Sequence, residues 1–192
     1  MNIGKPFVDA WNIYTKNIVT MLVALIIVII LSCVTLGILS VPLFIGFQML
    51  FVKAMRRKKI VANEVLAPIN RWFSLFFGNL AISILIFIGV LLLVVPGLAW
   101  AAWWMYTLLF IFDRNMHIED GMRSSKEVVR KNGTWWHLLF LIILSFINVV
   151  VGQIILAFGI PFWVYYVLAI LITAPITSGA LACAYADESK GI

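Results

Sequence analysis

The chain has 192 residues, of which 64% are hydrophobic and only 11% are charged, and its formal net charge at pH 7 is +6. A soluble domain uses roughly 25% charged residues to cover its surface, so this composition excludes a water-soluble globular fold. Lipid is expected to surround most of the chain. A nucleic-acid partner is not expected, because the +6 charge is expected to be spread along a membrane surface.

Three long runs contain no Asp, Glu, Lys or Arg, and they cover residues 18–52, 72–112 and 133–186. Each run is too long for one membrane-spanning helix. A helix of about 40 residues would be about 60 Å long, twice the hydrocarbon core of about 30 Å. Each run is therefore predicted to be a hairpin of two helices.

A proline stands near the middle of each run, in LGILSVP (Leu36–Pro42), LLLVVPG (Leu91–Gly97) and LAFGIP (Leu156–Pro161). Proline disfavours a helical residue before it and suits the first turn of the next helix. We therefore expect one helix to end near Val95 and the next to begin at Pro96, with similar turns in the other two runs. The six predicted helices cover residues 18–39, 42–56, 73–94, 96–112, 134–158 and 161–186.

A short segment of mixed polarity precedes each hairpin. The three segments are KPFVDAWNIYTKN (Lys5–Asn17), NEVLAPINRWF (Asn63–Phe73) and IEDGMRSSKEVVRKNG (Ile118–Gly133). In the third, apolar and small residues share one helical face, and charges at i, i+4 spacing occupy the other. The predicted fold is thus all-α, with six transmembrane helices in three proline-turned hairpins. A cytoplasmic interfacial amphipathic helix is expected before each hairpin.

The whole chain, residues 1–192, is expected to form a single transmembrane domain. The recurring unit of interfacial helix and hairpin divides it into three internal repeats, residues 1–59, 60–115 and 116–192. The alternative is that any six-helix protein with cytoplasmic loops shows this layout, and the hydropathy pattern does not separate the two.

The charges also predict sidedness. All 14 lysines and arginines lie before, between or after the hairpins, and the three turns carry no charge. The positive-inside rule then places both termini and both long loops in the cytoplasm. The expected location is the cytoplasmic membrane, with several passes.

Two groups of cations lie at the expected cytoplasmic surface. Such groups attract anionic lipid headgroups, at about 1 kcal/mol for each cation near the surface. The predicted headgroup-binding residues are Arg56, Arg57, Lys58 and Lys59 after the second helix, and Arg123, Lys126, Arg130 and Lys131 in the third interfacial segment. Anionic membrane lipids are therefore the expected partners, and a homo-oligomer or a membrane-protein partner is also compatible with the sequence.

The predicted spans contain few polar residues. Gln48, Asn148 and Gln153 are expected either to line a polar cavity or to form hydrogen bonds between helices. Pro175 lies within the last predicted helix, among small residues that allow close packing of another helix: Thr177, Ser178, Gly179, Ala180, Cys183 and Ala184. Cys33 and Cys183 are expected at different depths, which rules out a disulfide between them.

No set of residues specifies a reaction. The sequence lacks the motifs HExxH, CxxC, the nucleophile elbow and a phosphate-binding glycine loop. Asp113, His117 and Glu119 could form a weak interfacial metal site or act on a lipid headgroup, but a solvated loop followed by a helix start is the favoured interpretation. No metal, cofactor or catalytic residue is therefore predicted.

Two functions from different classes fit these features. The favoured one is a non-enzymatic integral membrane protein that organises lipid or a protein partner at the cytoplasmic face. The alternative is a transporter or channel for a small or amphiphilic solute.

The region from Pro96 to Leu141 also carries a family resemblance. It is similar to a family of uncharacterised six-helix bacterial and archaeal membrane proteins, which includes the membrane domain fused to some glycerophosphodiester phosphodiesterases. The matching residues are Pro96-Gly97, Asp113, Ser125, Lys131-Asn132 and Trp135, whereas Gly121 departs from the usual alanine. The resemblance implies a six-helix membrane fold and no catalytic residues, because the phosphodiesterase chemistry belongs to a separate domain.

Overall fold

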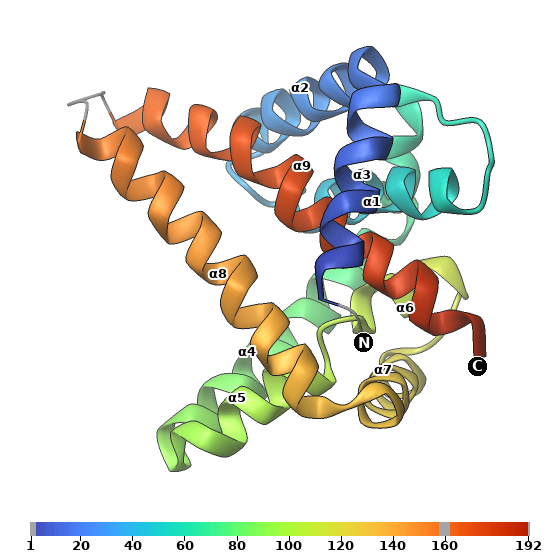
Figure 1. Cartoon of the computed structure of the whole chain (residues 1–192), viewed down its shortest axis with the longest axis vertical. Coiled ribbons are helices and arrows are strands. Elements are labelled where there is room, and N and C mark those ends of the chain that lie inside the picture. Colours follow the sequence, from blue (N-terminus) through green and yellow to red (C-terminus); the bar gives the residue numbers. More distant parts are fainter. Residues whose placement is uncertain (1–2, 158–161, 192) are drawn as a thin grey trace.

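A computed structural model describes residues 3–157 and 162–191, and every regular element in these ranges is a helix (Figure 1). The elements are α1 (Gly4–Lys16), α2 (Ile18–Val34), α3 (Ser40–Met55), the 3₁₀-helix η1 (Ala62–Arg71), α4 (Trp72–Leu92), α5 (Val94–Trp103), α6 (Thr107–Asp113), α7 (Ile118–Asn132), α8 (Thr134–Ala157), α9 (Phe162–Glu188) and the 3₁₀-helix η2 (Ser189–Gly191). The all-α prediction is confirmed for the described residues.

Four helical segments in the described part of the chain are long and apolar enough to cross a membrane: Ala62–Leu92, Val95–Asp113, Thr134–Ala157 and Val167–Glu188. A fifth is added if α1 and α2, which are bent by 97° relative to each other, count as one span. Helix α3 is apolar but shorter, with 16 residues. These helices indicate a multi-pass membrane protein, whereas the full count of six spans stays a prediction.

The first hairpin turns where the backbone enters the left-handed region. Leu36 and Gly37 have φ values of 50° and 84°, a conformation that glycine adopts without strain. Helix α2 therefore ends at Val34, earlier than the predicted residue 39, and α3 begins at Ser40, two residues before Pro42. The turn predicted at Pro161 lies outside the described residues.

The second hairpin turns slightly before the predicted proline. Leu93 is extended, with φ −160° and ψ 127°, between the end of α4 and the start of α5 at Val94. Pro96 therefore lies in the first turn of α5, and the predicted reversal of the chain is confirmed two residues earlier than expected. The two helices pack closely because a side chain on Gly97 would collide with the backbone of Val90.

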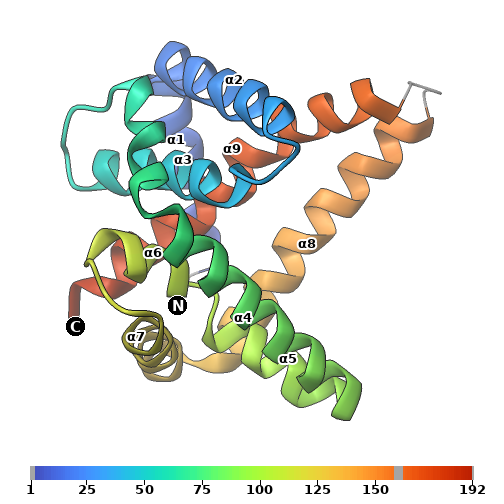
Figure 2. The same cartoon turned by 180° about the vertical axis from the view of Figure 1, so that it is seen from behind.

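The two described hairpin turns point to one side of the molecule, the left in Figure 1 and the right in Figure 2, and the end of α8 and the start of α9 lie on the same side. The two termini, α7 and the segment 56–61 lie on the opposite side. The charged segments are thus collected away from the apolar turns, as the charge pattern requires. We call the side with α7 and the termini the polar side.

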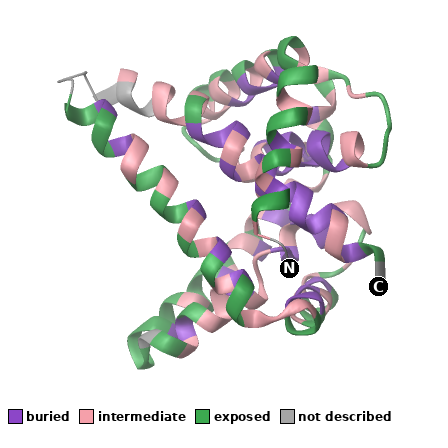
Figure 3. Cartoon of the chain, in the orientation of Figure 1, coloured by how far each residue is buried: buried purple, intermediate pink, exposed green. Residues whose placement is uncertain are grey.

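Burial is concentrated where α3, α6 and the second half of α9 meet (Figure 3). The small residues of α9 allow this, since a side chain on Gly179 would collide with the Phe51 ring and lie against Ala10. Cys183 belongs to the same buried part of α9, whereas Cys33 is exposed on α2, and both thiols are free, as predicted. The hairpin tips and much of α8 expose large apolar side chains, which suits contact with lipid.

Candidate functional site

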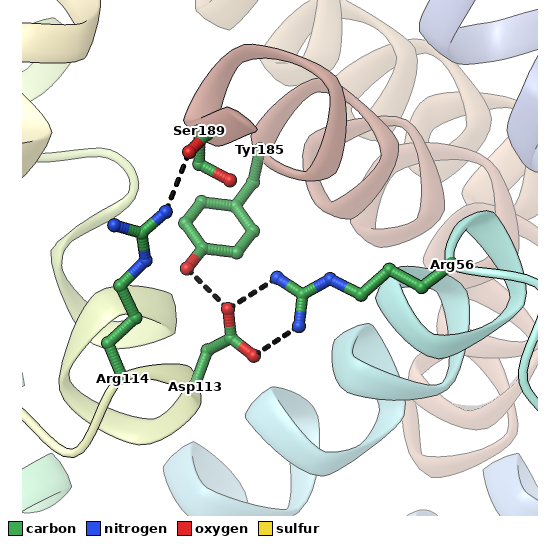
Figure 4. Close-up of polar contacts among 5 residues, drawn as sticks. All are labelled: Arg56, Asp113, Arg114, Tyr185 and Ser189. Carbon is green, nitrogen blue, oxygen red and sulfur yellow. Dashed lines mark hydrogen bonds and ion pairs between the residues drawn. The ribbon is translucent and has the colours of Figure 1, made fainter. Parts of the chain in front are cut away.

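A cluster of polar side chains joins several helix ends on the polar side. Its centre is Asp113, the last residue of α6, which stands at the end of an otherwise apolar span. Arg56 follows the last residue of α3, and Tyr185 lies near the end of α9. Figure 4 shows both side chains pointing at the Asp113 carboxylate. Residues from three distant parts of the sequence are thereby brought to one carboxyl group.

The Asp113 carboxylate accepts three hydrogen bonds. Arg56 donates two of them, from Nη1 to Oδ1 at 2.7 Å and from Nη2 to Oδ2 at 2.6 Å. The Tyr185 hydroxyl donates the third, to Oδ2 at 2.8 Å. A bidentate arginine–carboxylate pair is among the stronger polar contacts in proteins. These bonds raise the pKa of Arg56 above its usual value, so the pair is an ion pair at any physiological pH.

Further polar contacts extend the cluster on both sides. The Arg114 guanidinium donates to the carbonyl oxygen of Ser189 at 2.6 Å, which fastens the end of α9 to the end of α6 (Figure 4). On α3, Lys53 donates to Glu64 of η1 at 2.8 Å. Beside the Lys53–Glu64 pair lies a cavity of about 260 Å³, bordered by Lys53, Glu64 and Asp113 together with apolar side chains. The charges that border the cavity are already paired.

A second buried pair joins the start of α8 to the end of α9. The His137 side chain is fully buried, with Nδ1 at 2.9 Å from the Gly133 carbonyl oxygen and Nε2 at 2.6 Å from Oε2 of Glu188. A carbonyl oxygen only accepts, so Nδ1 carries a hydrogen. A second hydrogen must lie between Nε2 and Oε2, on one atom or the other. The pair is neutral overall in both cases, which limits the cost of burying it.

A break between α5 and α6 is bridged from α7. Helix α5 ends at Trp103, and α6 begins only at Thr107. The Ser125 hydroxyl donates to the carbonyl oxygen of Trp103 at 2.7 Å and accepts from the Tyr106 amide at 3.2 Å. Ser125 is fully buried, so it satisfies two backbone groups that the break would leave without partners.

The predicted headgroup-binding residues fall into two kinds. Arg56 is held in the ion pair with Asp113, so its guanidinium is not available to bind a lipid headgroup in the way that was predicted. The other three cations after α3 are exposed: Arg57, Lys58 and Lys59. The four cations of α7 line a shallow groove along that helix together with Glu127: Arg123, Lys126, Arg130 and Lys131. Lys126 also lies over the Trp103 ring, with Nζ 4.5 Å from the ring centre.

The structure does not bring the three predicted cavity-lining amides together. Gln48 is buried on α3. Asn148 and Gln153 lie on α8 and are exposed. The Asn148 amide donates to the carbonyl oxygen of Leu144 at 2.8 Å, a bond within its own helix. A common cavity lined by all three is therefore not present in the described part of a single chain.

The alternative metal site of Asp113, His117 and Glu119 is also not formed. Asp113 faces Arg56 and Tyr185, whereas His117 and Glu119 are exposed around the start of α7. Among the described residues, no group of three or more His, Cys, Asp and Glu side chains is arranged to hold a metal ion.

Sequence reasoning missed the partners within the cluster. Tyr185 stands in a run of small apolar residues, which indicated only close helix packing. Glu188 follows the predicted end of the last helix at residue 186, and no sequence pattern linked it to His137. The available signal was that Asp113, His137 and Glu188 all stand at ends of apolar runs on the same predicted side, where unpaired charges are costly.

Comparison of the chain with protein-family models, with curated proteins and with solved structures returned no match. The resemblance around Pro96–Leu141 thus remains a prediction from the sequence.

Proposed function

We propose that the chain is a multi-pass membrane protein whose polar side binds anionic lipid headgroups and organises lipid there, without catalysing a reaction. The proposal depends on one observation. Some cations of the polar side are paired with carboxylates at helix ends, and others lie exposed on its surface.

The neutralised cations hold helix ends together. Arg56 pairs with Asp113, Lys53 pairs with Glu64, and Lys5 lies 2.5 Å from Asp187. Together with the His137–Glu188 contact, these pairs account for the carboxylates at the ends of α6 and α9 and in η1. The acidic groups best placed to perform chemistry are therefore occupied by structural contacts, which supports a non-catalytic role.

The displayed cations form two clusters. Arg57, Lys58 and Lys59 are exposed and make no ion pair with any described residue. They border a hollow that also includes Asn17, at the bend between α1 and α2. We call these three residues the loop cluster, and the cations that line the α7 groove the α7 cluster. Both lie on the polar side (Figure 1).

The two clusters suit the surface of a membrane. A cation near an anionic leaflet contributes about 1 kcal/mol, so the loop cluster alone would contribute about 3 kcal/mol. The positive-inside rule assigns the same residues to the cytoplasmic side, where anionic lipids are abundant. Both termini would then lie in the cytoplasm, with the hairpin turns on the outer side.

Native mass spectrometry of the purified protein tests the proposal. We expect the protein to retain phosphatidylglycerol in preference to phosphatidylcholine. Replacing the loop cluster by glutamine, as Arg57→Gln, Lys58→Gln and Lys59→Gln together, should weaken phosphatidylglycerol binding about 100-fold, since 1.4 kcal/mol is a factor of ten. Circular dichroism checks that the variant is folded.

A matched control removes a cation that already has a partner. Lys53 pairs with Glu64, so Lys53→Gln with Glu64→Gln removes a cation together with its partner, leaves the net charge unchanged and should change lipid retention less than threefold. Equal retention of both lipids by the unaltered protein would contradict the proposal. So would unchanged phosphatidylglycerol binding in the loop-cluster variant.

The alternative of a solute transporter receives less support. It depended on a polar cavity lined by Gln48, Asn148 and Gln153, and two of these residues lie on an exposed face of α8.

A further inference from the structure

Helix α8 carries amide side chains on a surface that should face hydrocarbon. It lies at the edge of the fold in both views, apart from α2 and α3 (Figures 1 and 2). Asn148 is exposed, and its neighbours Phe146 and Val149 are 66% and 59% exposed. An amide is thus displayed in the middle of an apolar face.

The depth of Asn148 makes this exposure costly. At 1.5 Å per residue, Asn148 lies about 21 Å along α8 from its first residue, within a hydrocarbon core of about 30 Å. Its side chain is too short to reach either headgroup region. The amide makes one hydrogen bond, from Nδ2 to the Leu144 carbonyl oxygen, which leaves the side-chain oxygen and one N–H without a partner in the described chain. Lipid tails supply neither donor nor acceptor.

A second copy of the chain supplies the missing partner at the right depth. A carboxamide is both donor and acceptor, so it pairs with an identical group. Copies inserted in the same direction place their Asn148 residues at equal depth, and a two-fold axis along the membrane normal brings these residues together. An unrelated helix would meet this requirement only with a polar residue at the same level.

Two further exposed polar residues lie on the same helix. Ser145 precedes Asn148 by about one turn and is small enough to allow close approach of a second helix. Gln153 lies about 28 Å along α8, near the outer boundary of the hydrocarbon core, where it can contact either a partner or the headgroups. Ser145 and Asn148 thus share one face of α8, whereas Gln153 lies on a neighbouring face.

We propose that α8 is the interface of a homodimer, in which Asn148 of each copy hydrogen-bonds to Asn148 of the other across a two-fold axis along the membrane normal. This proposal does not depend on the binding of anionic lipid. It is therefore tested in bilayers of phosphatidylcholine, where the proposed function makes no contribution.

Single-molecule photobleaching of the labelled full-length protein, at increasing dilution in lipid, measures the dimer directly. Removing the amide in Asn148→Leu should weaken association about 10-fold, the effect of one interhelical hydrogen bond in a membrane. Asn148→Gln keeps the amide and should retain dimers to within about threefold, as expected for a preserved hydrogen bond. The control is Ser83→Leu on α4, another exposed polar residue within a span, which should leave association unchanged.

Cysteine cross-linking gives a second measurement that does not depend on the strength of association. In a background with Cys33→Ser and Cys183→Ala, Asn148→Cys should form disulfide-linked dimers under mild oxidation, and Ser83→Cys should not. A protein that is monomeric at every dilution would overturn the proposal. So would unchanged association of Asn148→Leu, cross-linking at position 83 but not 148, or a different membrane protein bound to α8 in place of a second copy.

Discussion

Replacing Asp113 by alanine removes the acceptor that joins three helix ends. The Arg56 guanidinium would lose two hydrogen bonds, and the Tyr185 hydroxyl would lose one. The Asp113 side chain is only 7% exposed, whereas that of Arg56 is 38% exposed. The variant therefore leaves a partly solvated cation and a hydroxyl without their partner.

The magnitude follows from these exposures. Removing one member of a buried ion pair costs about 3–5 kcal/mol when the remaining charge is fully buried. Arg56 can regain water, so we take about 2 kcal/mol for its share, and the lost Tyr185 hydrogen bond adds about 1 kcal/mol. Asp113→Ala should then lower the free energy of unfolding by about 3 kcal/mol. Asp113→Asn keeps the shape and one acceptor oxygen, and should cost about 1–2 kcal/mol.

Denaturant titration in detergent micelles measures these values, with Glu127→Ala on the exposed face of α7 as a control that should change stability by less than about 0.5 kcal/mol. A double-mutant cycle of Asp113→Ala and Arg56→Ala isolates the ion pair and should give a coupling energy of about 2 kcal/mol. A coupling energy below about 0.5 kcal/mol would refute the reasoning, because the pair would then contribute no more than a solvated surface contact.

Three other predictions concern the break, the helix packing and the topology. Ser125→Ala should lower the free energy of unfolding by about 1–3 kcal/mol, since two buried backbone groups at the break between α5 and α6 lose their partner. Gly46→Ala should destabilise by about 2 kcal/mol or more, because the added methyl group would collide with the backbone carbonyl of Val65, which cannot rotate away. In intact cells, a membrane-impermeant maleimide should label Leu36→Cys at the first hairpin turn, but should label Lys58→Cys only after the membrane is opened.

Each of these three predictions has a control or an outcome that would contradict it. Ser124→Ala, on the neighbouring residue of α7, removes only a long contact to Met116, and equal losses for the two serines would contradict the bridging role. A fully stable Gly46→Ala variant would show that η1 and α3 are not in close contact. Labelling of position 58 from outside intact cells would invert the proposed orientation, and both cysteine variants require Cys33→Ser because Cys33 is itself exposed.

Local properties of the sequence determined most of the helices and their ends. The exceptions are α2, which ends at Val34 rather than at residue 39, and the predicted helix 96–112, which is divided into α5 and α6. The uncharged runs are long because a helix must be apolar over about 20 residues to cross the lipid. The proline-containing segments interrupt these runs through backbone sterics, which depend only on adjacent residues. Helix boundaries such as Thr134 and Leu92 thus fell within a few residues of those predicted. The separation of charged segments from the hairpin turns could likewise be predicted, because it follows from the order of residues along the chain.

The partners of the polar groups were decided only by the tertiary structure. Asp113 pairs with Arg56, 57 residues away, and with Tyr185, 72 residues away, while Asn148 remains on an open face. Hydropathy does not predict such pairs, because a membrane helix is apolar on all sides and no stripe indicates which face meets which neighbour. The faces are selected by close packing at residues such as Gly46 and Gly179, and that packing depends on the shapes of several helices together.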